Sequence, residues 1–281
     1  MDRVIEVGAR CVVMGILNVT PDSFFDGGRN INIDAAVGAA RQMVEDGADI
    51  VDIGGESTRP GAAAVDTVEE LRRVIPVIEQ ITTQLTVPVS IDTRKASVAE
   101  AALGAGAIIV NDVSAMSHDP SMVDVVRGAS AGVVLMHMQG DPKTMQTDPH
   151  YKDVVAEVQG WLAQRARWAE NRGISPGSIV IDPGIGFGKT LEHNLALIRS
   201  VKRFKQEGFP VLVGPSRKRF IGAVLGLEAD ERLEGTAATV SLLVEQGVDI
   251  VRVHDVKEMV RVARMTEALR GPLASGDGLS L

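Results

Sequence analysis

Short runs of aliphatic and β-branched residues recur along the chain at even intervals, and each run ends in a polar residue or a glycine. Unbroken apolar runs of this kind, without strict polar alternation, are typical of parallel strands that are buried on both faces. The eight predicted strands are Val12–Asn18, Ile50–Gly55, Val87–Asp92, Ile108–Val113, Gly132–His137, Ile179–Gly184, Pro210–Ser216 and Ile250–Asp255.

The segments between these runs carry helix signals. Asp66 and Thr67 each stand three residues before a glutamate, and this capping-box spacing predicts a helix over Val68–Gln84. Glycines stand where helices would end before the next strand. They are Gly47, Gly106, Gly173, Gly208 and Gly247.

The spacing of the strands predicts the fold. Asn18 ends the first strand and His254 lies near the end of the last, so 236 residues cover seven intervals of about 34 residues. Eight βα units of that size favour a (β/α)8 TIM barrel. A doubly wound open sheet also alternates strands and helices, but such sheets rarely reach eight regular units. We expect one barrel domain over residues 1–270, with a short N-terminal cap over residues 1–11 and a loose tail over residues 271–281.

Composition narrows the classes of function. The 281 residues include 29 Lys and Arg against 37 Asp and Glu, and a net charge of −8 argues against nucleic acid or an anionic membrane as the main partner. The single cysteine, Cys11, excludes an intramolecular disulfide and a zinc site built on paired cysteines. The first residues lack a signal-peptide pattern, and no apolar run approaches the roughly 20 residues that span a bilayer. We therefore expect a soluble, cytoplasmic protein.

Polar groups stand at the carboxyl ends of the predicted strands, where barrels of this kind build their active sites. This strand-end ring consists of Asn18, Glu56, Asp92, Asn111 with Asp112, His137, Asp182, Lys218, and Arg252 with His254. Long loops rich in Gly, Pro, Asp or Arg follow the first, second and fifth strands. They are interpreted as lids over a ligand, with ordinary solvent loops as the alternative.

The ring separates into two chemical sets. Carboxylates beside an amide and a lysine suit a flat heterocycle with amino and ring N–H groups, although a salt-bridged barrel end is the alternative for each carboxylate. This first set is Asp92, Asn111, Asp182 and Lys218. A cationic set in an acidic chain predicts a local site for a diphosphate or a carboxylate. It contains Arg59, Arg217, Arg219, Arg252 and His254. His137 is interpreted either as a member of the ring or as a side chain that packs in the barrel mouth.

The sequence lacks the motifs of two other kinds of site, a nucleotide-binding loop and a histidine-based zinc site. The segment PGIGFGKT (Pro183–Thr190) resembles a Walker A loop but has proline in place of the first glycine, and Lys189 takes the last glycine position of a G-x-G-x-x-G motif. The five histidines lack the spacing of a zinc site.

Several longer motifs resemble the dihydropteroate synthase family, in family order, from Val12 to Arg264. They are GILNVTPDSFFDGG, DIGGESTRPGA, SIDT, NDVSA, MHMQGDPKTMQ, DPGIGFGK, SRKRFIG and VRVHDV. The resemblance implies condensation of 6-hydroxymethyl-7,8-dihydropterin diphosphate with 4-aminobenzoate, which gives dihydropteroate and diphosphate. It also implies a homodimer that forms through outer helices, with which the apolar content of residues 237–248 is compatible, and inhibition by sulfonamides.

The resemblance assigns roles to residues of this chain. The positions that match the family's pterin ligands are Asp92, Asn111, Asp182 and Lys218. Those that match its diphosphate ligands are Asn18, Thr58, Arg252 and His254, with Mg²⁺ at Asn18. For aminobenzoate the matching positions are Thr58, Arg59, Pro60, Phe187, Lys218 and Arg219, with Phe24 and Asp26 from the first loop.

The implied mechanism is loss of diphosphate from the pterin methylene carbon, followed by attack of the aniline nitrogen. Stabilisation of the leaving group is expected from Mg²⁺, Asn18, Arg252 and His254, and closed loops would exclude water. Asp26 is expected either to stabilise the cationic centre or to help take the departing proton. The residues expected to be catalytic are Asp26, Lys218, Arg252 and His254.

Pro215 and Phe25 depart from the family pattern, which puts the pocket shape in question rather than the activity. Two alternatives remain open. A methyltetrahydrofolate-to-corrinoid methyltransferase would keep the pterin pocket, but it would not need the diphosphate set. A catalytically silent pterin-binding barrel is disfavoured by the intact Asn18, Asp92, Lys218 and His254.

Overall fold

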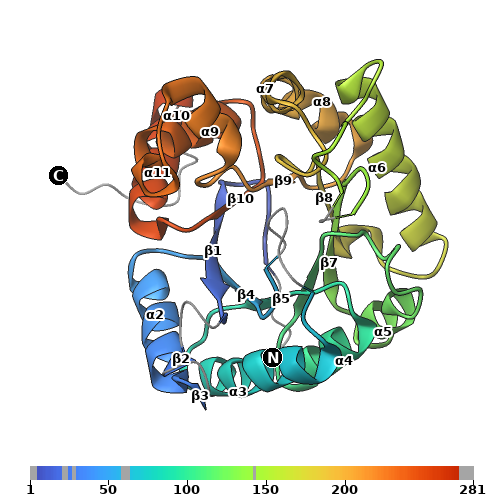
Figure 1. Ribbon diagram of the computed structural model, residues 1–281, viewed down its shortest axis with the longest axis vertical. Helices are drawn as coiled ribbons and strands as arrows, with labels where there is room; N and C mark the ends of the chain where they lie inside the picture. The colour runs from blue at the N-terminus through green and yellow to red at the C-terminus, as the bar shows by residue number, and fades with distance from the viewer. Residues whose placement is uncertain (1–4, 21–24, 27–29, 58–63, 142–143, 272–281) are drawn as a thin grey trace.

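The computed structural model describes residues 5–20, 25–26, 30–57, 64–141 and 144–271. Its large parallel sheet contains the strands β1 (Val12–Asn18), β4 (Ile50–Gly54), β5 (Val89–Asp92), β6 (Ile109–Asp112), β7 (Gly132–Met136), β8 (Ile179–Asp182), β9 (Leu212–Val213) and β10 (Ile250–Val253). The strands pair in the order β8-β7-β6-β5-β4-β1-β10-β9. A parallel bridge between Ile181 and Val211 then joins the two ends of the sheet (Figure 1). All eight predicted strands are present, and the (β/α)8 barrel is confirmed.

Helices surround the barrel in Figure 1, and most of them connect one strand to the next. They are α2 (Ile33–Glu45), α3 (Thr67–Gln84), α4 (Ala96–Gly104), α5 (Met122–Gly128), α6 (Val154–Glu170), α7 (Leu191–Arg199), α8 (Val201–Phe204), α9 (Arg219–Leu225), α10 (Leu233–Glu245) and α11 (Val256–Arg270). Short 3₁₀ turns cover Pro176–Ser178, Lys205–Glu207 and Ala229–Glu231. None of the helices in the described ranges has the length and apolar content needed to cross a lipid bilayer.

The predicted helix ends are confirmed. Asp66 is the N-cap of α3, and its side chain accepts a hydrogen bond from the backbone N–H of Glu69 at 2.9 Å. The five glycines predicted to end helices all have positive φ angles, between 83° and 106°. A left-handed residue at this point satisfies the last helix carbonyls and turns the chain toward the next strand.

The loop after β1 contains a short antiparallel hairpin that the hydrophobic pattern did not predict. It pairs β2 (Phe25–Asp26) with β3 (Asn30–Ile31). A two-residue strand carries too few residues to show a period of two, so the hydrophobic pattern contains no signal for it.

Inward-facing side chains form layers inside the barrel. One apolar layer consists of Val12, Met14, Ile50, Val134, Leu212 and Ile250. Ile5 and Val7 pack against this layer from the N-terminal segment, which confirms the short cap. Because side chains alternate along a strand, the next inward positions after Ile50 and Ile250 are Asp52 and Arg252. The barrel interior therefore changes from apolar to polar toward the carboxyl ends of the strands.

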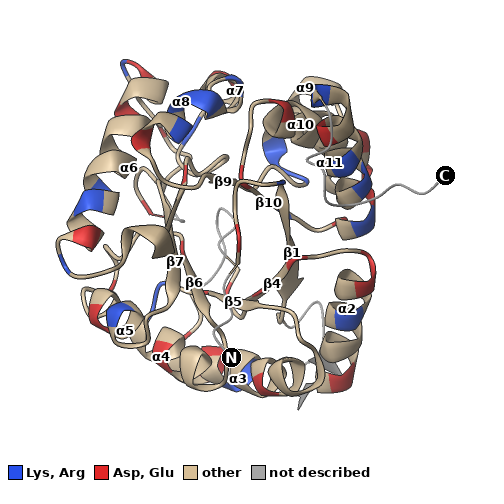
Figure 2. Cartoon of the chain, turned by 180° about the vertical axis from the view of Figure 1, so that it is seen from behind, with Lys and Arg blue, Asp and Glu red and all other residues tan. Residues whose placement is uncertain are grey.

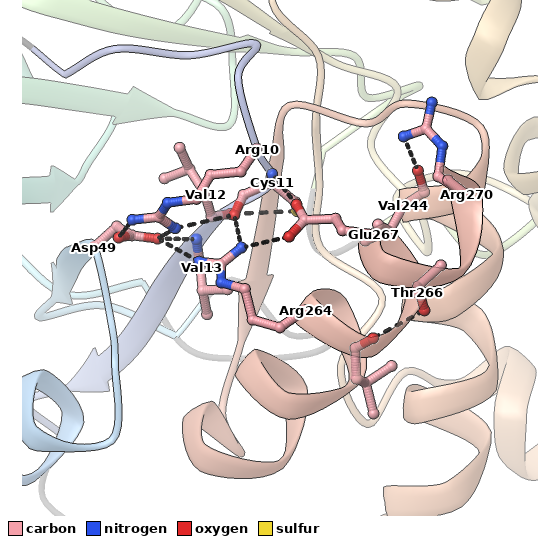
Figure 3. A network of polar contacts seen from close by, with 11 residues as sticks. Arg10, Cys11, Val12, Val13, Asp49, Val244, Arg264, Thr266, Glu267 and Arg270 are labelled. Atoms are coloured by element: carbon pink, nitrogen blue, oxygen red, sulfur yellow. Dashed lines mark hydrogen bonds and ion pairs between the residues drawn. The ribbon is translucent and has the colours of Figure 1, made fainter. Parts of the chain in front are cut away.

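A polar network lies at the amino end of β1, away from that polar layer (Figure 3). Arg10 forms an ion pair with Asp49, whose carboxylate also accepts from the Val13 N–H at 2.8 Å. Arg264 of α11 donates to the Cys11 carbonyl at 2.9 Å and to Glu267 at 3.0 Å. The last helix is thus tied to the first strand, which helps to close the ring.

Candidate active site at the barrel mouth

Charged residues of both signs are spread over the outer helices, and only a few interrupt the barrel strands (Figure 2). Three of these few meet inside the barrel. The Nε atom of Arg252 lies 2.6 Å from Oδ2 of Asp52, and its Nη2 atom lies 2.7 Å from Oδ2 of Asp92. Asp52 is fully buried and Asp92 is 8% exposed. Arg252 thus bridges two carboxylates that come from β4 and β5.

Asn111 joins the same group from β6. Its Nδ2 atom donates to Oδ2 of Asp52 at 3.0 Å, and the side chain is buried. Asp92 and Asn111 of the predicted heterocycle set and Arg252 of the predicted anion set therefore lie in one network, and Asp52 is at its centre.

The strand-end pattern does not include Asp52, because this residue stands in the middle of an apolar run rather than at its end. Glu56, which was assigned to the strand-end ring, instead lies in a separate cluster. It forms ion pairs with Lys95 at 2.6 Å and with Arg94 at 3.4 Å. The signal that would have found Asp52 is its place two residues after an inward isoleucine, on the same face of the strand.

Burial changes the acidity of the two carboxylates that were assigned to the heterocycle set. It raises the pKa of Asp92, and Asp52 raises it further, while the positive charge of Arg252 lowers it. It raises the pKa of Asp182 to about 6, against hydrogen bonding from the Gly184 N–H and the charge of Lys218. Each carboxyl group accepts hydrogen bonds when it is ionised and donates one when it is protonated. This suits a heterocycle that carries both hydrogen-bond donors and acceptors.

The loop after β8 holds Asp182 in place through glycines. The Gly184 N–H donates to Oδ1 of Asp182 at 2.7 Å, and Gly184 has a φ of 68°. A Cβ atom on Gly184 would lie 2.0 Å from the His137 carbonyl oxygen, and one on Gly188 would lie 2.4 Å from the Gln139 carbonyl oxygen. Only glycine allows this loop to pack so closely on the loop after β7.

Lys189 and His137 pack together beneath the glycine loop. Lys189 is 3% exposed, and its Nζ atom lies 3.1 Å from Nδ1 of His137 and 2.9 Å from the Phe187 carbonyl oxygen. Burial lowers the pKa of Lys189 to about 7 and that of His137 to about 3. The His137 ring also makes an edge contact with Trp161, with the ring centroids 5.0 Å apart. The packing interpretation of His137 is therefore correct.

Lys218 and Phe187 meet at the mouth. Lys218 is the N-cap residue of α9, and its Nζ atom lies 4.2 Å from the centroid of the Phe187 ring. A Cβ atom on Gly186 would lie 3.3 Å from Cδ of Lys218, so glycine leaves room for the lysine stem to cross the loop. Lys218 thus holds a cation over an aromatic face and acts on Asp182, an arrangement that suits a flat heterocycle.

The loop after β9 is tied to the end of β10. Ser216 Oγ lies 3.2 Å from the backbone nitrogen of His254 and 3.0 Å from its Nδ1 atom. Arg217 forms an ion pair with Asp255 and has a φ of 56°. Arg217, which the sequence placed in the anion set, is thus a tie between two loops, while Arg219 is exposed at the start of α9.

Asn18 ends β1 beside Asp92. A Cβ atom on Gly54 would lie 3.5 Å from Cβ of Asp92 and 3.8 Å from Oδ1 of Asn18, so Gly54 leaves space between them. The described part of the chain contains no group of three or more His, Cys, Asp or Glu side chains arranged to hold a metal ion. A single amide oxygen fits Mg²⁺ only if substrate oxygens and water complete the coordination, which is the usual arrangement for this ion at phosphate sites.

Four predicted ligands, Phe24, Thr58, Arg59 and Pro60, lie outside the described residues, as does the predicted tail after Gly271. Asp26 lies in β2, where its backbone pairs with Asn30.

Comparison with known proteins gives one family. Residues 14–254 match the family model for pterin binding enzymes. The chain is 49% identical over 260 residues to the dihydropteroate synthase of Bacillus subtilis, a match that covers 92% of this chain and 89% of that protein.

Two solved structures have the same fold. Dihydropteroate synthase from Yersinia pestis, in complex with a sulfonamide drug, superposes with a TM-score of 0.89 and 42% identity, over 93% of this chain and 95% of that chain. The enzyme from Xanthomonas albilineans with 4-aminobenzoic acid superposes with a TM-score of 0.88 and 46% identity, over 94% of each chain.

Proposed function

The chain belongs to the pterin binding enzymes and, within them, to the dihydropteroate synthases, and from that premise we propose that its barrel mouth condenses 6-hydroxymethyl-7,8-dihydropterin diphosphate with 4-aminobenzoate. The observation that carries the proposal is the junction of Arg252, Asp92 and Asn111 inside one barrel end. A heterocycle site and a cationic group for a diphosphate are thereby adjacent.

The pterin is bound by the buried polar layer. Asp92 and Asp182 accept from its amino and ring N–H groups, Asn111 offers an amide beside them, and Lys218 donates to a ring oxygen or nitrogen. The burial of Asp92, Asn111 and Asp182 supports this assignment, because hydrogen bonds to charged groups are stronger where water is excluded.

The diphosphate leaves from the side where Arg252 lies in β10 and His254 directly follows the strand. The bond from the pterin methylene carbon to the diphosphate oxygen breaks, and the electron pair departs with the oxygen. Donors that are already in place stabilise the charge that develops on this oxygen. Asn18 would hold Mg²⁺ together with the substrate, and the ion would supply Lewis-acid stabilisation of the leaving group.

The aminobenzoate ring lies against Phe187, with its carboxylate toward Lys218 and Arg219 near the start of α9. Its aniline nitrogen forms the new bond to the methylene carbon and then loses a proton. Further contacts with aminobenzoate are assigned to the other positions that match the family's ligands, which are Thr58, Arg59, Pro60, Phe24 and Asp26. Because a sulfonamide has a similar aniline and a similar anionic end, we expect it to compete at this site.

An assay of diphosphate release tests the proposal. We expect release from the pterin diphosphate that depends on both 4-aminobenzoate and Mg²⁺ and is inhibited by a sulfonamide in competition with aminobenzoate. The formation of dihydropteroate, measured by absorbance after chromatographic separation, should match the diphosphate released. Diphosphate release that depends on neither 4-aminobenzoate nor Mg²⁺ would contradict the condensation. A corrinoid methyltransferase would release no diphosphate.

We propose further that the protein forms a homodimer in the cytoplasm. Exposed apolar side chains lie on three neighbouring helices, α9, α10 and α11 (Figure 1). They are Val224, Leu225, Leu242, Met265 and Leu269, with exposures between 42% and 75%. Apolar surface of this kind favours contact with a second copy. A cytoplasmic location is supported by the substrate, because an anionic diphosphate does not cross a bilayer unaided.

A further inference from the structure

Asp52 is a fully buried carboxylate in the middle of β4. Its Oδ2 atom accepts from Nε of Arg252 at 2.6 Å and from Nδ2 of Asn111 at 3.0 Å. Among the described residues, its Oδ1 atom has no hydrogen-bond partner. A buried ion pair with an unsatisfied oxygen contributes little to stability, because the loss of hydration offsets the attraction. The preceding inward residue, Ile50, is apolar, so the fold by itself does not require a carboxylate on this face.

We propose that Asp52 is a positioning residue for the pterin diphosphate, which holds the Arg252 guanidinium and the Asn111 amide in their working orientations without touching the substrate. This inference rests on the proposed function. The complete burial of Asp52 keeps it out of contact with a ligand in the mouth.

For Arg252, the consequence is a fixed guanidinium plane. Nε is bound by Asp52 and Nη2 by Asp92, so two carboxylates define the orientation of the planar group. The Nη1 donors then serve the diphosphate. Without Asp52, the guanidinium has one carboxylate left, Asp92, and the arginine competes with the pterin for it.

For Asn111, the consequence is the direction of the amide. Its Nδ2 atom faces Oδ2 of Asp52. The reversed amide would set its own oxygen against a carboxylate oxygen, and two acceptors repel each other. Asp52 therefore decides that Asn111 offers its carbonyl oxygen as an acceptor to an amino or N–H group of the pterin.

The test compares Asp52→Asn with a matched control, Asp249→Asn. Asp249 is also buried, pairs with Lys205 and accepts from the Val211 N–H at 2.7 Å, but it lies at the amino ends of the strands. Because misplacement of a binding group by about 1 Å costs about 100-fold in rate, we expect Asp52→Asn to lower kcat/KM for the pterin diphosphate by about that factor. KM for 4-aminobenzoate should stay within about twofold. Asp249→Asn should leave both constants within about twofold.

A double-variant cycle separates positioning from general damage. If Asp52 acts through Arg252, then Asp52→Asn costs much less in an Arg252→Lys background than in the unmodified enzyme. The proposal is overturned if the fold losses in kcat/KM of the two single variants multiply in the double variant. It is also overturned if kcat/KM of the Asp52→Asn enzyme stays within about threefold of the unmodified one.

Asp52→Glu provides a second variant in case Asp52→Asn does not fold. It keeps the charge and moves the carboxylate by one methylene, so positioning predicts a loss of at least about tenfold, whereas a role in charge balance alone predicts near-normal activity.

Calorimetric binding of pterin-6-carboxylate, which does not react, separates this inference from the proposed function. If the unmodified enzyme releases no diphosphate, the function fails, and weaker pterin binding by the Asp52 variants still supports positioning. Equal binding contradicts it.

Discussion

At the scale of single residues, burial rather than identity determines what the carboxylates of the mouth do. Asp182 and Asp49 are both aspartates near strand ends, but Asp49 forms an ion pair with Arg10, whereas Asp182 is buried with a backbone N–H as its hydrogen-bond donor. Residues of the same type therefore stand in different surroundings, and burial raises the pKa of Asp182. The pattern of the sequence showed where these residues lie along the chain and did not show this difference.

The raised pKa of Asp182 predicts how stability depends on pH. Its value in the folded protein is about 6 and its ordinary value is 3.8, so the folded state binds more protons between these values. Its contribution to the free energy of unfolding therefore falls as pH rises from about 4 to 6. Lys218, Lys189 and Arg252 face the group and oppose this shift. Asp182→Asn, which keeps the acceptor for the Gly184 N–H, should gain stability relative to the unmodified protein as pH rises.

Urea unfolding of both proteins at pH 4.5 and pH 7.5 measures this difference. The variant is expected to be relatively more stable at the higher pH. A difference between the two proteins that is the same at both pH values would show that the carboxyl of Asp182 titrates normally.

At the scale of elements, strands and helix ends were well predicted, because their signals are local. The positive φ of Gly47 and Gly247 follows from a helix end directly before a strand. The glycines of the loop after β8 have a different origin, since they allow two loops to approach each other. The sequence DPGIGFGK gives the positions of these glycines, and only the packing of the two loops shows which atoms each glycine approaches.

Gly184 provides a test at this scale. Gly184→Ala places a Cβ atom 2.0 Å from the His137 carbonyl oxygen in a left-handed conformation. We expect the free energy of unfolding to fall by about 2 kcal/mol or more, because both the clash and the backbone strain must be relieved. Urea unfolding gives the value.

Gly177→Ala is the matched control, because a Cβ atom there meets nothing within 4 Å. It should change stability by less than about 1 kcal/mol. If Gly184→Ala and Gly177→Ala change the free energy of unfolding by the same amount, the close approach of the loop after β8 to the His137 carbonyl is contradicted.

At the scale of the whole molecule, the closed barrel leaves its outer helices to determine association. The helices α9, α10 and α11, which carry exposed apolar side chains, are neighbours in the ring of helices (Figure 1). Val68 on α3 is also apolar and is 76% exposed, but it lies elsewhere on the ring. This contrast makes the proposed dimer testable.

The double variant Leu242→Glu with Met265→Glu should convert a dimer to a monomer, because four like charges would be buried in a symmetric interface. Light scattering after size-exclusion chromatography measures the mass. Val68→Glu should leave the mass unchanged. A monomeric unmodified protein, or a double variant with unchanged mass, would count against this surface.

The sequence by itself determined the strands, the helix ends and the polar character of the mouth. Burial on both faces requires apolar runs such as Val12–Asn18, and a helix end requires a residue such as Gly106, so both leave local patterns. Tertiary structure decided the partners. Arg252 and Asp52 are 200 residues apart in sequence, and they meet because the closed sheet places β10 and β4 on either side of β1 with both side chains inward. Asp52 joins the site because it lies within β4 on the inward face, where its partners come from distant strands. Glu56 follows the end of β4 and pairs instead with Lys95 and Arg94.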